Sequence, residues 1–546
     1  MLKMKNLFGS KPKPKRTESR RPLIENNNIS LQGGCDLPSC DSNDNLIKTF
    51  HTNEEQPSQI AWQTNYQDLA EVLGVAPDAN TSVDGVCCSI QPEADSEGRV
   101  KRLIQRFVHK HFPKPPADPN KNLHKHLENV KNTVYSEVGR LHLLLDGERQ
   151  TEYLIECYHC QTFDQLHDLI QDISSSQSSF HLMDWVLHTY LSLDLSDFLD
   201  LPEKLKKPDP VMSSEWIGKA KDKLLENVQK EVKGQLEKIL QSDRVQEGCD
   251  NDEAIIRLCV DTIGCIDAMP KEAKKISSKL SVQVQEICFS ELLVFLERYT
   301  AEQAEALIKE AKEDRPNMWL FFKTLKTCEE LKKHVQRKGL ISNKSLLEDI
   351  VQKLDDMETL TRKLQLKVVA DFAEKHLKSY FKADNKLFLL SLTLKANFPK
   401  IQHCQDLQEK VMDEACRLIV QTYLKHLLQR SQKQLQKYWS HDVGKTITDD
   451  AELLHKAMTE LAPGVQQRNL LLEKVAEMSD CNDINALKIT VASMQEECQT
   501  LSDDMDLLPK LLRWKGLPHR RVRAVLSVIP GHQPRPVSCF SCLRCW

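Results

Sequence analysis

The chain has 546 residues, of which 40% are hydrophobic and 28% charged, a composition typical of globular proteins with several packed units. Its formal net charge of -4 indicates no general affinity for nucleic acid, and no apolar run approaches the ~18 residues that span a bilayer. The 18 cysteines follow no disulfide framework and the start has no apolar signal-peptide core, so we expect reduced thiols in the cytoplasm.

The first 21 residues form a basic arm. It contains eight basic side chains and one acidic side chain, Glu18, which gives a net charge of +7. The apolar residues Leu2, Met4, Leu7 and Phe8 lie in the same segment. Each Lys or Arg near anionic lipid contributes about 1 kcal/mol, so the arm is predicted to bind anionic plasma-membrane lipid, with a phosphoinositide-rich inner leaflet preferred. A solvated arm is the alternative interpretation. The predicted membrane-binding residues are Lys3, Lys5, Lys11, Lys13, Lys15, Arg16, Arg20 and Arg21.

Proline placement and apolar periodicity divide the rest of the chain. Prolines gather before residue 120 and after residue 508, and between Val211 and Leu508 there are four, so long helices can run there. Residues 22–98 are rich in Asn, Ser, Asp, Gly and Pro and are expected to be mostly disordered. The predicted parts are a largely disordered 1–98, an amino-terminal helical bundle 99–210, a central long-helix bundle 211–400, a carboxy-terminal helical bundle 401–529 and a Cys-containing tail 530–546.

The first predicted bundle contains the segment 180–199. Leu182, Trp185, Val186 and Tyr190 recur at helical spacing, which predicts that Trp185 is a core residue and not a binding residue. Upstream, the histidine pairs 109/111 and 124/126 are two residues apart and share no helix face, so solvated side chains are expected.

The longest uninterrupted apolar stripe runs over 345–381. It contains no Gly or Pro, and Ser345 followed by Glu348 fits a capping box. A helix of this length would extend about 55 Å and would need other helices to cover its stripe. The residues expected to be buried are Leu347, Ile350, Leu354, Met357, Leu364, Val368 and Phe372.

Other boundaries follow from proline and glycine. Pro270 is expected to separate helices over 255–266 and 282–311, and 411–438 is expected to be one helix. Residues 507–529 are predicted to form one or two short helices, broken at Gly516-Leu517-Pro518. A secondary basic patch lies in this last region, formed by Arg513, Lys515, Arg520, Arg521 and Arg523.

Motifs for catalysis or metal binding are incomplete. Gly444-Lys445-Thr446 matches the second half of a phosphate-binding loop, but Trp439 stands where its first glycine would be. Cys157-Tyr158-His159-Cys160 has ligand spacing without the second pair that a structural zinc needs. We therefore expect no enzyme activity, no catalytic residue, no metal and no cofactor.

The tail carries Cys539, Cys542 and Cys545 at regular spacing. Three cysteines lack the fourth ligand of a metal cluster, and Cys545 is second from last, which does not match a prenylation box. Two interpretations remain open, namely S-palmitoylation beside Phe540 and Leu543, or an unmodified tail.

The apolar stripes keep no strict heptad across segments and show no fixed repeat, which disfavours a single coiled coil and a regular solenoid. The predicted fold is therefore all-α, an elongated rod of stacked antiparallel helical bundles.

Three stretches carry a resemblance to a known family. They are Leu182-Met183-Asp184-Trp185-Val186-Leu187 with Tyr190 and Phe198, then Phe295-Leu296-Glu297-Arg298-Tyr299, and ALKITVASMQEECQTLSDD from Ala486 leading to Leu511-Leu512-Arg513-Trp514-Lys515-Gly516-Leu517. In this order along a helical chain, over roughly 99–529, they resemble the exocyst complex component 3 family, in its exocyst-component-3-like branch.

The resemblance implies a vesicle-tethering rod without enzyme activity that acts in exocytosis and membrane protrusion. It implies exocyst subunits, SNARE proteins and a Ral-type small GTPase as partners, and a cytoplasmic location that is peripheral at the plasma membrane and exocyst-associated. A cytoskeletal or coiled-coil structural scaffold without a link to tethering is the alternative, which a sustained heptad would favour.

Overall fold

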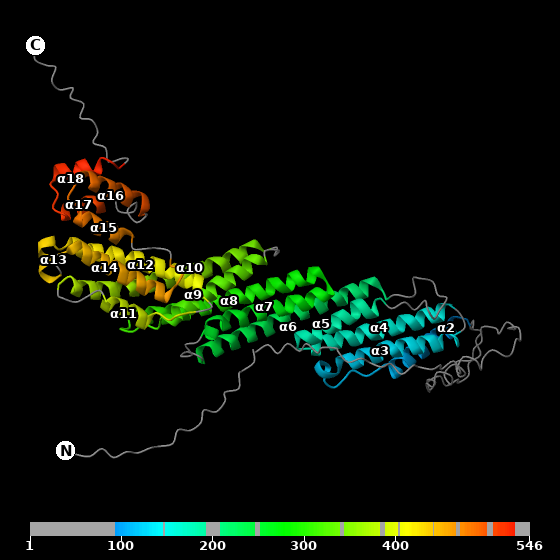
Figure 1. Cartoon of the computed structure of the whole chain (residues 1–546). Coiled ribbons are helices and arrows are strands. Elements are labelled where there is room, and N and C mark those ends of the chain that lie inside the picture. The colour runs from blue at the N-terminus through cyan, green and yellow to red at the C-terminus, as the bar shows by residue number, and fades with distance from the viewer. Residues whose placement is uncertain are drawn as a thin grey trace, which may run out of the picture. The chain divides into compact units, whose positions relative to one another are not determined.

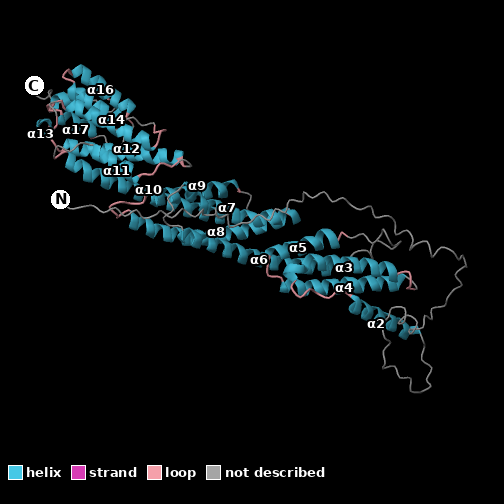
Figure 2. Cartoon of the chain, turned by 60° about the horizontal axis from the view of Figure 1, so that its bottom comes forward, coloured by secondary structure: helices cyan, strands magenta, loops and turns pink. Residues whose placement is uncertain are grey.

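The computed structural model describes residues 93–145, 148–192, 208–245, 252–338, 343–382, 388–401, 404–439, 442–465, 470–498 and 506–529. These residues form seventeen α-helices, one π-helical turn and no strand, and Figure 2 shows only helices and loops among them. The all-α prediction is therefore confirmed for this part of the chain. The basic arm 1–21 and the tail 530–546 lie outside the described residues.

The elements are labelled in Figure 1. In chain order they are α2 (Glu93–His111), α3 (Pro119–Leu141), α4 (Glu148–Asp172), α5 (Ser176–Asp184), the π-helical turn η1 (Trp185–Tyr190), α6 (Pro210–Val245), α7 (Asp252–Ile276), α8 (Ser278–Glu310), α9 (Met318–Arg337), α10 (Lys344–Tyr380), α11 (Phe388–Asn397), α12 (Gln405–Leu428), α13 (Gln432–Tyr438), α14 (Val443–Leu461), α15 (Leu470–Asp480), α16 (Ile484–Glu497), α17 (Leu507–Trp514) and α18 (His519–Leu526).

The helices belong to two compact units. Unit 1 comprises Met1–Gln235 and Gly264–Cys288, and unit 2 comprises Leu236–Ile263 and Phe289–Trp546. The helices α6, α7 and α8 each contribute residues to both units. Each unit has its own buried apolar core.

In unit 1, α4 packs against α2 and α3, and α3 also packs against α5. Figure 1 shows α3 and α4 side by side. Trp185 is buried at the start of η1 and stacks on Tyr190 with ring centroids 5.3 Å apart, which confirms it as a core residue. His126 is also buried, with Nε2 2.9 Å from Gln165 Oε1, so its predicted solvation was wrong.

Buried polar side chains join α6 to the neighbouring helices of unit 1. Asn227 Nδ2 donates to the Ile173 carbonyl oxygen at 3.1 Å and to Ser179 Oγ at 2.9 Å. Ser176 Oγ donates to Glu231 Oε2 at 2.5 Å. Because buried polar groups need partners, these bonds fix the register of α6 against α4 and α5.

In unit 2, α10 packs against α9 and α12. The predicted long helix is confirmed within one residue at each end, but its cap is different. Asn343, not Ser345, is the N-cap, because Asn343 Oδ1 accepts a hydrogen bond from the Leu346 backbone N–H at 3.2 Å.

The buried face of α10 also departs from the expected stripe. Leu347 and Leu364 are only partly buried, whereas Thr361 and Gln365 are buried. An α-helix drifts about 20° per heptad relative to a strict 3.5-residue repeat, so the residues that face its neighbours change along a helix of this length.

Two other helix boundaries differ from expectation. Pro270 lies inside α7, where the helix continues because buried Ile266, Ala273 and Ile276 pack on both sides of it. The segment predicted as one helix over 411–438 is divided into α12 and α13 by Ser431, whose hydroxyl and backbone form a capping box with Gln434.

Candidate functional site

The helices α17 and α18 carry the secondary basic patch, and their geometry follows from local sequence. In α17 the buried residues are Leu508, Leu511 and Leu512, which leaves the opposite side to solvent. Gly516 ends α17 with a φ of 95°, its N–H bonded to the Arg513 carbonyl at 2.8 Å. The Leu517 N–H bonds to the Leu512 carbonyl at 3.2 Å, which completes a Schellman motif.

Pro518 is the N-cap of α18, and the predicted break at Gly516-Leu517-Pro518 is confirmed. The buried residues of α18 are Val522, Val525 and Leu526, which form one face of the helix. The helix packs against α16 and α17 through this face. Its arginines are therefore placed on the side away from the core.

Two hydrogen bonds anchor the end of α17 to the rest of unit 2. Trp514 Nε1 donates to the Arg430 carbonyl at 2.7 Å, and Lys515 Nζ donates to the Ser479 carbonyl at 2.7 Å. Burial lowers the pKa of Lys515, and the nearby Asp480 acts in the opposite direction. Lys515, predicted as part of the basic patch, therefore has its ammonium group turned inward.

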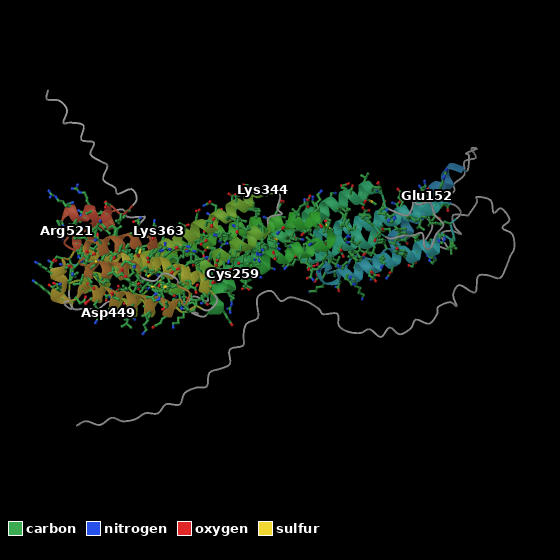
Figure 3. All side chains as sticks on the ribbon, turned by 45° about the horizontal axis from the view of Figure 1, so that its top comes forward. Glu152, Cys259, Lys344, Lys363, Asp449 and Arg521 are labelled. Atoms are coloured by element: carbon green, nitrogen blue, oxygen red, sulfur yellow. The ribbon has the colours of Figure 1, made fainter. Side chains whose placement is uncertain are left out.

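The four arginines of the patch remain on the surface. Arg513, Arg520, Arg521 and Arg523 are exposed, and we call them the arginine surface. Among the described residues none of them has a carboxylate within ion-pair distance, although Arg513 Nε donates to the Pro509 carbonyl at 3.1 Å. Figure 3 labels Arg521 among side chains with nitrogen ends that project from this part of unit 2.

The sequence explains why no acid neutralises this surface locally. From Leu507 to Ile529 there is no Asp or Glu, and the exposed Lys510 adds a further positive charge. Guanidinium groups present planar donors that match carboxylate or phosphate oxygens in a bidentate way. The arginine surface can therefore bind an anionic partner, and it offers no nucleophile or general base for catalysis.

The partial phosphate-binding motif Gly444-Lys445-Thr446 lies at the start of α14. Gly444 lies in the first turn of α14, where the Asp442 side chain caps the Lys445 N–H at 2.9 Å, and the Asp480 carboxylate lies against Gly444. An acidic side chain therefore lies beside the glycine of this motif.

The cysteine pair Cys157 and Cys160 lies on α4. Burial raises the pKa of Cys157 to about 11 and raises that of Cys160. Within the described ranges, no three His, Cys, Asp or Glu side chains gather at metal-binding distance. None of the described helices is long and apolar enough to cross a membrane.

Comparison with known proteins identifies a shared fold. No model of a protein family matches the sequence. The crystal structure of M-Sec is similar with a TM-score of 0.55 and 19% sequence identity, over 82% of this chain and 81% of that chain. At this identity the similarity shows the helical fold alone, and that fold is the one expected from the sequence resemblance.

Proposed function

We propose that the protein is a non-enzymatic tethering scaffold of the exocyst-component-3-like type, most like M-Sec (tumour necrosis factor alpha-induced protein 2). The shared helical fold, which extends over most of both chains, supports the type of protein. The start of the chain, MLKMKNLF, also resembles the M-Sec subfamily. The predicted rod shape and the division into bundles stay predictions.

The observation that carries the binding role is the arginine surface. Four exposed arginines have no carboxylate partner among the described residues, and the guanidinium groups of Arg520, Arg521 and Arg523 are available for charge-assisted hydrogen bonds. An acidic surface of a Ral-type small GTPase, an exocyst subunit or a SNARE protein fits this chemistry. The protein would work in the cytoplasm at the plasma membrane, in exocytosis and membrane protrusion.

The first experiment measures binding of a purified, GTP-loaded Ral-type GTPase to the full chain by calorimetry. Replacing Arg520, Arg521 and Arg523 by Gln should lower the affinity at least about 100-fold, because hydrogen bonds to charged groups contribute about 1.5–3 kcal/mol each.

The matched control removes three charges from exposed α7 positions, as Lys271→Gln, Lys274→Gln and Lys275→Gln. Two of these lysines already have acidic partners, Asp267 and Glu272, so binding of the GTPase should not change. Equal loss in both triple variants would mean that only net charge matters, and no loss in either would reject the arginine surface as the binding site.

The second experiment tests the amino-terminal arm as the membrane contact. Replacing Lys11, Lys13, Lys15 and Arg16 by Ala removes about 4 kcal/mol of attraction to anionic lipid, roughly a thousandfold in affinity. Co-sedimentation with phosphoinositide-containing and neutral liposomes, at low and high salt, measures this loss. Equal sedimentation of both proteins on anionic liposomes would show that the arm is a solvated segment.

A further inference from the structure

Two histidines from separate helices of unit 1 meet at the surface. His124 on α3 and His181 on α5 are 57 residues apart in sequence, yet His124 Nδ1 lies 3.2 Å from His181 Nε2. The ring centroids are 5.1 Å apart and the ring planes meet at 50°. His124 is exposed and His181 is partly exposed, so a solute can reach the pair.

We propose that His124 and His181 together chelate one divalent transition-metal cation of the Zn²⁺ class and so clasp α3 to α5. Tetrahedral zinc binds imidazole nitrogen at about 2.0–2.1 Å, which places two such nitrogens about 3.3 Å apart. The observed separation of 3.2 Å matches this spacing. The χ2 torsion of histidine is broad, so both rings can turn to direct their lone pairs to one cation.

The protonation of the two rings allows a cation to replace the hydrogen bond between them. Without a cation, one imidazole N–H donates to the lone pair of the other ring. When the cation binds, that proton moves to the second nitrogen of the same ring, and both facing nitrogens then carry lone pairs. No net proton is released, and no redox partner is needed.

A carboxylate and an ion-paired lysine lie close to the histidine pair in sequence. Asp184 lies three residues after His181 and accepts from His188 Nδ1 at 2.8 Å. The nearby Lys121 is paired with Asp118 at 3.1 Å, so its charge is balanced.

Other histidines of this unit are bound to different side chains. His126 Nε2 lies 2.9 Å from Gln165 Oε1, and His159 Nδ1 lies 2.8 Å from Tyr190 Oη, both in the core. The pair of His124 and His181 has no third protein ligand among the described residues, so water completes the coordination. The site is therefore exchangeable, unlike a closed structural zinc site.

The test is titration of the full chain with Co²⁺, a spectroscopic substitute for Zn²⁺, followed by displacement with Zn²⁺. Visible absorption separates nitrogen ligands from the thiolates that the 18 cysteines could supply. The variants are His124→Ala and His181→Ala, and the matched control is His109→Ala, an exposed histidine on α2. Circular dichroism establishes that each variant is folded, and His124→Asn replaces any that is not.

We expect one nitrogen-ligated Co²⁺ per chain, displaced by Zn²⁺ and not by Mg²⁺. Loss of either imidazole should weaken binding at least about tenfold, since loss of even an outer-shell partner commonly costs 10- to 100-fold, and His109→Ala should bind as the wild type does. Zn²⁺ should also raise the unfolding temperature of the wild type but not of His124→Ala. Thiolate-only absorption, or equal binding by wild type and both variants, would overturn the proposal.

Discussion

The two units each bury an ionisable side chain beside tyrosine, and they hold it in opposite ways. In unit 1, His159 Nδ1 donates to Tyr190 Oη at 2.8 Å, and that hydroxyl donates to Thr162 Oγ1 at 3.1 Å. In unit 2, Asp450 Oδ2 accepts hydrogen bonds from Tyr380 at 2.6 Å and from Tyr423 at 2.8 Å. The first arrangement has an imidazole as a donor to a hydroxyl group, and the second provides two donors to a carboxyl group.

The pKa of each group shows what burial does to the two arrangements. Burial lowers the pKa of His159 to about 4, so this imidazole is uncharged at neutral pH. Burial raises the pKa of Asp450 to about 6 although both tyrosine hydrogen bonds lower it. The two units should therefore respond to acid in opposite directions, since protonation opposes folding at His159 and favours it at Asp450.

The largest expected effect comes from a substitution next to Tyr190, the partner of His159 in unit 1. Trp185 is 5% exposed and stacks on Tyr190, so Trp185→Ala leaves a cavity beside the tyrosine ring whose hydroxyl contacts His159. We expect a loss of about 3–5 kcal/mol in the free energy of unfolding of unit 1, measured by hydrogen exchange of its peptides. Leu143→Ala, at a residue 77% exposed, is the control and should change it by less than about 0.5 kcal/mol. A wild-type exchange profile in Trp185→Ala would contradict the core assignment.

The second prediction concerns acid at His159. Its pKa is about 4 when folded and 6.5 in the unfolded chain, so the unfolded state binds more protons between these values. Unit 1 should therefore lose about 3 kcal/mol as the pH falls from 6.5 to 4. In His159→Gln this part of the pH dependence should vanish, with urea unfolding followed by hydrogen exchange as the measurement. An unchanged pH profile would mean that burial does not lower the pKa of His159.

The third prediction has the opposite sign in unit 2. The pKa of Asp450 is about 6 when folded and 3.8 in the unfolded chain, so the folded state binds more protons between these values. The free energy of unfolding should fall by about 3 kcal/mol as the pH rises from 4 to 6. Asp450→Asn should remove this slope, measured in the same way. If the difference between wild type and variant is constant with pH, the contrast between the units is wrong.

A fourth prediction tests whether a buried polar side chain without hydrogen-bond partners lowers the stability of unit 2. Gln365 is fully buried on α10, and neither its Oε1 nor its Nε2 has a hydrogen-bond partner. Gln365→Met keeps a similar volume and removes both polar groups, so unit 2 should gain about 1–3 kcal/mol in urea unfolding. The exposed Gln352 on the same helix supplies the control, as Gln352→Met. Destabilisation by Gln365→Met would indicate that the amide has a role in the core.

The fold was predictable where it depends on local periodicity. Ile350, Leu354 and Met357 are buried as their spacing predicts. An apolar helix face is buried in the folded protein regardless of which other element packs on it. The exceptions depend on contacts distant in sequence. Pro270 stays inside a helix and Gln365 stays in a core because neighbouring helices hold them there, which periodicity does not reveal.

The candidate site divides in the same way. The exposure of Arg520, Arg521 and Arg523 follows from the apolar spacing of α18, and the sequence was sufficient to find the patch. The inward turn of Lys515 depends on a carbonyl 36 residues away, and the approach of His124 to its partner depends on the packing of α3 on α5. Neither had a signal in the local sequence.

The smallest predicted effect concerns the N-cap of α10, an uncharged surface contact of unit 2 whose contribution to stability can be compared with that of the buried Asp450. Asn343 Oδ1 accepts the Leu346 N–H at 3.2 Å and caps α10, whereas Ser345 lies inside the first turn and is exposed. Asn343→Ala should therefore cost about 1 kcal/mol, and Ser345→Ala much less. Because an amide does not titrate, this loss should be the same at pH 4 and pH 7, in contrast to the effect of Asp450→Asn.

Urea unfolding of unit 2 at both pH values measures the two alanine variants side by side. A loss of about 1 kcal/mol in Ser345→Ala with none in Asn343→Ala would restore the capping box predicted from Ser345 and Glu348. A cap effect that changes with pH would mean that Asn343 is coupled to a charged group. The side-chain bond to Leu346 would then be only part of the interaction that starts α10.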